Sequence, residues 1–202
     1  MLYLKSVNNE LLELLNHLMR EEKLKNFVLV GGTALALQVG HRISIDIDLF
    51  GHSDFDQPTI LVTLNKYGTV QLLRKSENIL ILSLNGIKVD LVNYKYPWIG
   101  NLNIVENIRF ASLSDIAAMK LNAIAGRGSV KDFIDVFALL KIFSLREMLN
   151  FYNEKYQDGS EFMVIKSLTF FDDADKEVLP HLFIDTSWAE MKHQILAEID
   201  RL

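Results

Sequence analysis

The segment from Phe27 to Phe50, FVLVGGTALALQVGHRISIDIDLF, decides the fold of this chain. An apolar run ends at two glycines, continues as a short Ala/Leu stretch and returns as an apolar segment that carries Asp46 and Asp48. The pattern predicts a strand over 27–30, a helix over 33–39 and a second strand over 43–50. Because side chains alternate along a strand, the two carboxylates are expected on the same side of the sheet.

The composition is that of a globular protein. Of the 202 residues, 50% are hydrophobic and 12 are Phe, which is enough apolar surface for a sizeable core. The absence of Cys excludes disulfides and thiolate metal sites. A net charge of −5 is not typical of a nucleic-acid-binding protein. No apolar run approaches the ~18 residues of a spanning helix, and no signal peptide is evident, so we expect a cytoplasmic protein with no membrane partner.

The rest of the chain predicts an α+β protein. Two apolar runs, 78–84 and 87–94, flank Asn85-Gly86, which is a strong signal for a β-hairpin. Residues 96–103 are expected to form a loop, in which Tyr96 and Trp98 either stack on a base or, more commonly for loop aromatics, anchor the loop. Helices are expected over 8–25, 58–66, 113–125, 130–143, 144–156, 159–169 and 187–202. We therefore expect an α/β lobe with a mixed sheet over 1–110 and a helical lobe over 111–202.

A third carboxylate lies on the second strand of the predicted hairpin. Lys88 and Asp90 share one face of this strand, and Asp90 joins Asp46 and Asp48 if the strands are neighbours. Unpaired carboxylates side by side repel each other, but a divalent cation such as Mg²⁺ or Mn²⁺ turns them into ligands. Three carboxylates can hold two metal ions for displacement at phosphorus. We interpret Asp46, Asp48 and Asp90 as the metal ligands.

The glycine pair offers a place for phosphate groups. Gly31 and Gly32 let the backbone approach a ligand closely, and the helix that follows presents free N–H groups. Thr33 adds a hydroxyl donor. A triphosphate is expected to lie between this helix start and the metal ligands.

The segment from Ala117 to Leu140 supplies further charged residues. Lys120 and Arg127 are seven residues apart and share a helix face if the helix extends that far. Helix patterning alone favours a surface ion pair for Lys131 and Asp132. Asp135 lies beside the apolar stripe of its helix and is expected to point toward the interface between the lobes.

Each of these features alone is more often structural than functional. A Gly-Gly pair is usually a turn, and an Asp-x-Asp pair is usually a solvated strand face. Their combined order is far more specific: Gly31-Gly32-Thr33, Asp46-x-Asp48, Lys88-x-Asp90, Lys120, and Lys131-Asp132-x-x-Asp135.

This order resembles the AbiEii/AbiGii nucleotidyltransferase toxins of the DNA polymerase β-like superfamily, and GGTALALQVGHRISIDIDLF, LTFFDDAD and SWAEMK extend the resemblance over nearly the whole chain. The resemblance implies a nucleotidyltransferase fold and Mg²⁺-dependent transfer from ATP or another NTP by the toxin of a toxin–antitoxin or abortive-infection pair. Some members modify the tRNA 3′ end. It also implies that Gly32 and Thr33 cradle phosphate and that Lys120 binds the triphosphate. Asp135, or less favourably Asp132, would be the carboxylate of the fourth motif. The chemical role of this carboxylate stays open.

The working hypothesis follows from these assignments. Asp90 either holds a second metal or accepts the proton of the acceptor hydroxyl, and Lys120, with Arg127 or Arg42, neutralises the leaving pyrophosphate. The candidate catalytic residues are Asp46, Asp48, Asp90, Lys120 and Asp135. The candidate nucleotide-binding residues are Gly31, Gly32, Thr33, Arg42, Lys88, Lys120, Arg127, Lys131 and Asp132.

Three alternatives stay open from the sequence. The acceptor is either tRNA or a hydroxyl on a small molecule or protein, and the acidic charge mildly favours the latter. The second alternative is that the chain is an inactive binding module of the same fold. The blandest alternative is a structural α/β protein with a solvated acidic strand face.

Overall fold

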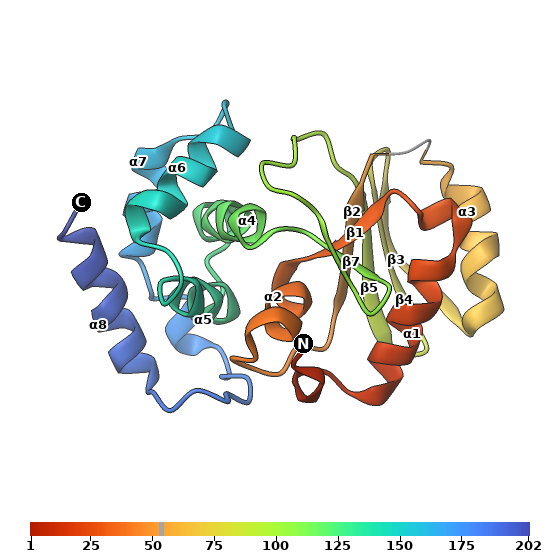
Figure 1. Ribbon diagram of the computed structural model, residues 1–202, viewed down its shortest axis with the longest axis horizontal. Helices are drawn as coiled ribbons and strands as arrows, with labels where there is room; N and C mark the ends of the chain where they lie inside the picture. Colours follow the sequence, from red (N-terminus) through yellow and green to blue (C-terminus); the bar gives the residue numbers. More distant parts are fainter. Residues whose placement is uncertain (53–54) are drawn as a thin grey trace.

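The computed structural model describes residues 1–52 and 55–202 and has an α+β fold (Figure 1). The strands are β1 Phe27–Val30, β2 Ile47–Gly51, β3 Val70–Ser76, β4 Ile79–Leu84, β5 Ile87–Asn93, β6 Asn103–Val105 and β7 Ile108–Phe110. The α-helices are α1 Asn9–Arg20, α2 Gly31–Val39, α3 Gln57–Leu64, α4 Leu113–Gly126, α5 Val130–Leu139, α6 Leu145–Lys155, α7 Glu161–Leu168 and α8 Trp188–Ile199.

All strands of the described ranges join one mixed sheet in the order β3-β4-β5-β2-β1-β7-β6. The centre is built from β1, which pairs antiparallel with β2, and from β2, which runs parallel to β5. This register places Asp48 beside both Val30 and Asp90. The end of β1, the start of α2 and the carboxylates of two further strands thus meet at one point of the sheet.

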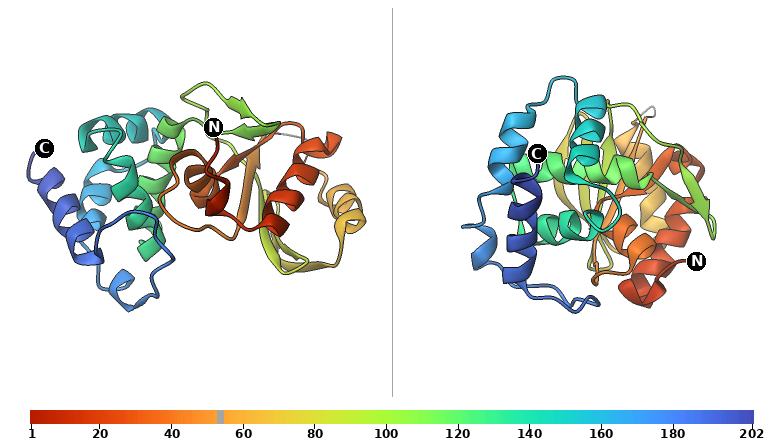
Figure 2. Two further views of the ribbon diagram at one scale, coloured as in Figure 1. Left: turned by 60° about the horizontal axis from the view of Figure 1, so that its bottom comes forward. Right: turned by 60° about the vertical axis from the view of Figure 1, so that its left-hand side comes forward.

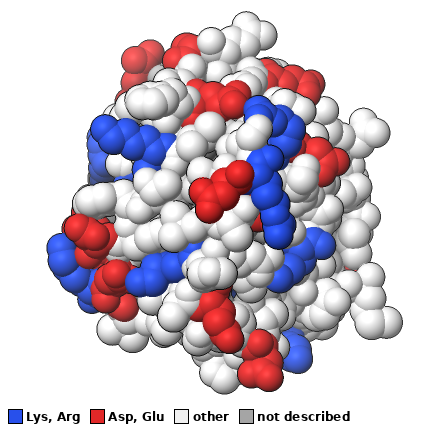
Figure 3. Space-filling view, turned by 90° about the vertical axis from the view of Figure 1, so that its left-hand side faces the viewer, with Lys and Arg blue, Asp and Glu red and all other residues white. Residues whose placement is uncertain are grey.

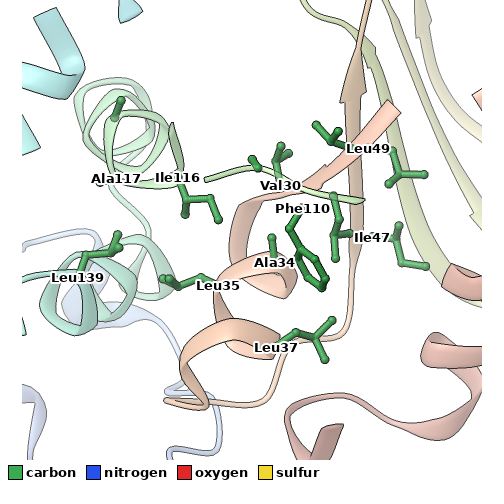
Figure 4. Packing of buried hydrophobic residues seen from close by; sticks show 14 of the residues in the cluster. Val30, Ala34, Leu35, Leu37, Ile47, Leu49, Phe110, Ile116, Ala117 and Leu139 are labelled. Atoms are coloured by element: carbon green, nitrogen blue, oxygen red, sulfur yellow. The ribbon is translucent and has the colours of Figure 1, made fainter. Parts of the chain in front are cut away.

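The helices form layers on the two faces of the sheet. Helices α1 and α3 lie on one face, α2 lies on the other, and α4 to α8 continue outward from α2 (Figures 1 and 2). Helix α2 is buried between the sheet and α4 and α5; its side chain Leu35 points toward Leu139, whereas Ala34 and Leu37 lie on the side of Phe110 (Figure 4). A helix that is apolar all round is expected at such a buried position.

One hydrophobic cluster runs through both predicted lobes, from Leu11 in α1 to Ile195 in α8. The division at residue 110 stays a prediction, because α2 belongs to the first lobe in sequence and packs against α4 and α5 of the second. Within residues 1–52 and 55–202, none of the helices combines the length and the apolar character needed to cross a bilayer.

The predicted hairpin is confirmed. Strands β4 and β5 pair antiparallel around Asn85 and Gly86, whose φ angles of 52° and 85° are both in the left-handed region. Two central residues with positive φ are the geometry that favours an Asn-Gly turn.

The predicted strand over 43–50 is wrong at its start, since β2 begins at Ile47. On one side its partner β1 ends at Val30, where the chain enters α2, so the residues before Ile47 have no antiparallel partner there. Their amides bond elsewhere: Ile43 N donates to His181 O and Ser44 N donates to Ser6 O. The prediction also missed β3, β6 and β7; β6 even takes Asn103 from the expected loop.

Candidate active site

Asp48 and Asp90 are register partners on the parallel strands β2 and β5. The pKa of Asp48 is raised from 3.8 to about 6, chiefly by burial and next by the neighbouring charge of Asp90. Like charges held together in a partly apolar environment disfavour ionisation in this way. A cation placed between the two carboxylates would relieve the repulsion.

The glycine corner lies directly against these carboxylates. Gly31 has a φ of +68°, and a Cβ atom built on it would lie 2.2 Å from Asp48 Oδ2. A Cβ on Gly32 would lie 2.2 Å from Arg42 Nη2. Only glycine therefore lets the Asp48 and Arg42 side chains reach the first turn of α2. No side chain caps that turn at Val30, so its N–H groups stay directed toward the carboxylates' end of the sheet.

The contacts of Thr33 differ from those expected of a hydroxyl that donates a hydrogen bond to phosphate. Its side chain is fully buried, and its hydroxyl contacts Ser44 Oγ at 2.8 Å and the backbone oxygen of Asp46. These contacts tie the first turn of α2 to the segment that carries Asp46. In this structure Thr33 positions a carboxylate.

Asp90 already has a cationic neighbour, since Lys88 Nζ donates to Asp90 Oδ1 at 2.5 Å. Asp46 lies one residue before β2 and lines the same cleft as Asp48 and Asp90. Among the residues that the structure describes, no three His, Asp or Glu side chains form a ready metal-binding group. The predicted cluster of three carboxylates is therefore not preassembled.

The donor set nevertheless suits a hard divalent cation. Carboxylate oxygens are the ligands that Mg²⁺ and Mn²⁺ prefer. Asp48 and Asp90 present such oxygens from adjacent strands, and Lys88 shows that a positive charge is stable at Asp90. These residues fit a metal ion that is bound together with a phosphate-containing substrate.

Asp135 is the centre of a buried ion network. Arg42 Nε and Nη2 donate to its two oxygens at 2.7 and 2.8 Å, His41 Nε2 lies 2.7 Å from Oδ1, and Lys120 Nζ lies 2.6 Å from Oδ2. Burial opposes ionisation of Asp135, but the charges of Arg42 and Lys120 outweigh it and hold the pKa well below its usual range. Asp135 does not line the cleft, so its visible role is to hold the three basic side chains. His41 carries no signal of this role in the sequence.

Asp132 belongs to the same network, and its interpretation as a surface ion pair is wrong. It is fully buried and accepts hydrogen bonds from Lys120, Arg127 and Ser129 at 2.7 to 3.1 Å. Burial raises its pKa, but Lys120 and Arg127 lower it more strongly. The helix pattern could not reveal this, because the partners come from α4 and from the turn after it.

These elements enclose a cleft of about 410 Å³ between the sheet and the helices. The structure brings most of the predicted site residues to it: Gly31, Gly32, Arg42, Asp46, Asp48, Asp90, Lys120, Arg127, Lys131 and Asp132. Thr33, Lys88 and Asp135 lie outside its lining. The sequence reasoning missed the aromatic part of the cleft, which consists of Phe50, Tyr94 and Tyr156 beside Tyr96.

The face formed by the helical end of the molecule shows acidic and basic side chains interspersed, with no continuous basic surface (Figure 3). This agrees with the net charge of −5. An extended polynucleotide needs a row of positive groups.

Comparison with known proteins shows the family of this chain. The family model "Nucleotidyl transferase AbiEii toxin, Type IV TA system" matches residues 13–104 and 96–201. The chain belongs to this AbiEii nucleotidyltransferase toxin family. It is also 38% identical over 173 residues to the Aquifex aeolicus (strain VF5) protein aq_aa25, with 83% of each chain covered.

Solved structures share the fold. A putative nucleotidyltransferase from Helicobacter pylori superposes with a TM-score of 0.60 at 16% identity and covers 95% of this chain and 91% of its own. The antibiotic-resistance factor ANT(2'')-Ia superposes with a TM-score of 0.56 at 13% identity, over 70% of this chain and 87% of its own. At these identities the likeness shows the fold and confirms the predicted α+β nucleotidyltransferase architecture.

Proposed function

We propose that this protein transfers a nucleoside monophosphate from an NTP to an acceptor hydroxyl in a reaction that depends on Mg²⁺ or Mn²⁺. The observation that carries the proposal is the facing pair of Asp48 and Asp90 next to the open turn of Gly31. Family membership supports nucleotidyl transfer as the chemistry. The metal ion, when bound by Asp46, Asp48 and Asp90, supplies charge neutralisation at the α-phosphate.

The chain's own residues account for the remaining requirements. The N–H groups at the start of α2 and the side chains of Arg127 and Lys131 lie where they can bind the phosphates. Asp90 accepts the proton of the acceptor hydroxyl. The acceptor oxygen forms the new bond to the α-phosphorus as the bond to the β-phosphate oxygen breaks, and pyrophosphate leaves. Lys120 is occupied by Asp132 and Asp135, so we assign it to holding α5 against the cleft while its charge faces the phosphates.

We propose tRNA, through its 3′ end, as the acceptor and a toxin role in a type IV-like toxin–antitoxin or abortive-infection system, with a cognate antitoxin as partner. The family supports the toxin role, and the tRNA acceptor is taken from the resemblance noted in the sequence. A cytoplasmic location is part of this proposal, since tRNA and NTPs are found there.

A second acceptor class has its own support. ANT(2'')-Ia has the same fold and is known in complex with adenylyl-2''-tobramycin, a nucleotidylated small molecule. The acidic net charge of this chain also favours a compact acceptor. The alternative is therefore transfer to a hydroxyl on a small molecule or protein.

The test is incubation with each of four labelled NTPs, Mg²⁺, and either total tRNA or a tRNA-free metabolite and protein extract. Label in RNA supports the first acceptor, and label only in the extract supports the second. Asp48→Asn should abolish transfer, whereas Asp172→Asn, an exposed carboxylate outside the cleft, should retain it. Transfer by Asp48→Asn at the wild-type rate would refute the site, and a wild-type protein that transfers nothing to any acceptor would favour the inactive binding module.

A further inference from the structure

One end of the cleft is aromatic, and the proposed mechanism does not use it. Phe50 follows Asp48 by two residues on β2 and lies on the same face of the strand. Tyr94 and Tyr96 come just after β5, the strand of Asp90, and Tyr156 follows α6. All four side chains line the cleft.

These rings form a continuous wall. Tyr94 lies 5.2 Å from Phe50 and 5.5 Å from Tyr96 between ring centroids, and Tyr96 meets Tyr156 edge-to-face at 4.6 Å. The hydroxyls of Tyr94 and Tyr156 bond to each other at 2.7 Å, so this part of the wall satisfies its own buried polar groups. The side chains of Phe50 and Tyr96 are only half-buried and remain accessible from the cleft.

A buried ion pair fixes the wall. Lys155 on α6 is 1% exposed; its Nζ donates to Pro97 O and to Asp115 Oδ1 and lies 4.6 Å from the Trp98 ring centroid. Asp115 in turn accepts from the amides of Ile99 and Gly100. Burial of a lysine and an aspartate is unfavourable unless both are fully bonded. Three of these bonds, to Pro97 O and from the amides of Ile99 and Gly100, hold the loop that carries Tyr96, so the wall is preformed.

We infer that this wall is a nucleobase-binding subsite, placed one nucleoside away from the carboxylates. The inference rests on the proposed function, because it adds the base to a site already assigned to the phosphates. Strand geometry sets Phe50 about 7 Å from Asp48 along β2, a separation that lies within the reach of one nucleotide. Aromatic side chains bind any base through its π face, and Asn122, which also lines the cleft, offers a donor and an acceptor to a base edge.

The base at the wall comes either from the NTP or from the terminal nucleotide of a nucleic-acid acceptor. Calorimetry in the presence of Mg²⁺ separates these sources. The ligands are ATP, inorganic tripolyphosphate and a single-stranded RNA ending in CCA. Wild type should bind ATP or the RNA more tightly than it binds tripolyphosphate, which has no base. Stacking of one base corresponds to about a 5- to 150-fold difference in affinity.

Tyr96→Ala should weaken the binding of one base-containing ligand by at least 5-fold and leave the affinity for tripolyphosphate unchanged. A loss for ATP assigns the subsite to the NTP, and a loss for the RNA alone assigns it to the acceptor; both support the inference. Tyr96→Phe should behave as wild type because it keeps the ring, and Phe162→Ala is the matched control, an aromatic residue that is 72% exposed on α7.

If Tyr96→Ala and Phe50→Leu both bound the two base-containing ligands with unchanged affinity, the subsite would be overturned. Binding of tripolyphosphate in the same experiment would still support the phosphate site. Equal loss for tripolyphosphate and ATP would also overturn it, since the wall would then act on the phosphates. Thermal melting of each variant checks that the fold is intact. If wild type bound none of the three ligands, both the subsite and the proposed function would fail together.

Discussion

Asp48 and Asp90 stand side by side on parallel strands, and this pairing gives the apo protein an unusual pH dependence. The pKa of Asp48 is raised to about 6 by burial and by Asp90, so between pH 3.8 and about 6 the folded state binds more protons than the unfolded state. The stability contributed by protonated Asp48 is complete below pH 3.8 and is lost as the pH rises through about 6.

The measurement is the free energy of unfolding by urea across this range, with a chelator present. Asp48→Asn should be more stable than wild type above pH 6 and should remove this part of the pH dependence. Asp172→Asn is the control. Superimposable pH profiles for wild type and Asp48→Asn would contradict the assigned pKa.

The buried network around Asp135 should behave in the opposite way. Its pKa lies well below 3.8, because Arg42 and Lys120 outweigh the effect of burial, so its contribution is present at neutral pH and is lost on acidification below 3.8. Asp135→Ala leaves three basic side chains buried without this partner and should destabilise the protein by about 3–5 kcal/mol at pH 7.

The matched control is Asp173→Ala, which removes an exposed pair with Lys176 and should change stability by less than about 1 kcal/mol. Denaturant unfolding of both variants at low and high salt makes the comparison. A change of similar size for Asp135→Ala and Asp173→Ala would show that the network is not buried as described.

Gly31→Ala should damage the site and the fold together. The left-handed φ of +68° is unfavourable for alanine by about 1–2 kcal/mol, and the new Cβ would collide with Asp48 Oδ2. We expect lower thermal stability and loss of nucleotidyl transfer. Gly126→Ala is the control, since a Cβ there meets nothing within 4 Å and alanine is the better helix former. If Gly31→Ala kept full activity, Asp48 would not need its position against α2.

Lys155→Met should loosen the loop that carries Tyr96 and Trp98. The substitution keeps the length of the side chain but leaves Asp115 buried without its cation, which costs about 3–5 kcal/mol. Near-ultraviolet circular dichroism should report the change through the rings that Lys155 contacts. The control Lys192→Met removes a more exposed lysine that also lies over an aromatic ring, and it should have a small effect. An unaltered spectrum and melting temperature for Lys155→Met would show that the ion pair does not hold the loop.

The sequence alone was sufficient to predict the parts of the fold that depend on local patterns. The Asn85-Gly86 hairpin needed only its turn residues and two apolar strands, and the helix predicted over 33–39 needed only its composition, although it begins earlier, at Gly31. Short strands such as β6 and β7 have too few residues to show a period, so they could not be predicted. The exposed edge strand β3 lacks the apolar alternation that marks a half-buried strand.

The order of Gly31-Gly32, Asp46, Asp48 and Asp90 along the chain was enough to indicate the family. Strand alternation, which is a local rule, was enough to predict the strand faces of Asp48 and Asp90, whereas Asp46 lies just outside β2. Only the tertiary structure decided which charges are free to meet a substrate. Lys120, Arg42 and Asp135 look like candidate ligands in sequence, yet Asp135 of α5 binds both Lys120 of α4 and Arg42 of the segment that follows α2. Charges removed from water must find partners in space, and distances in space between helices are not written in the spacing of residues along them.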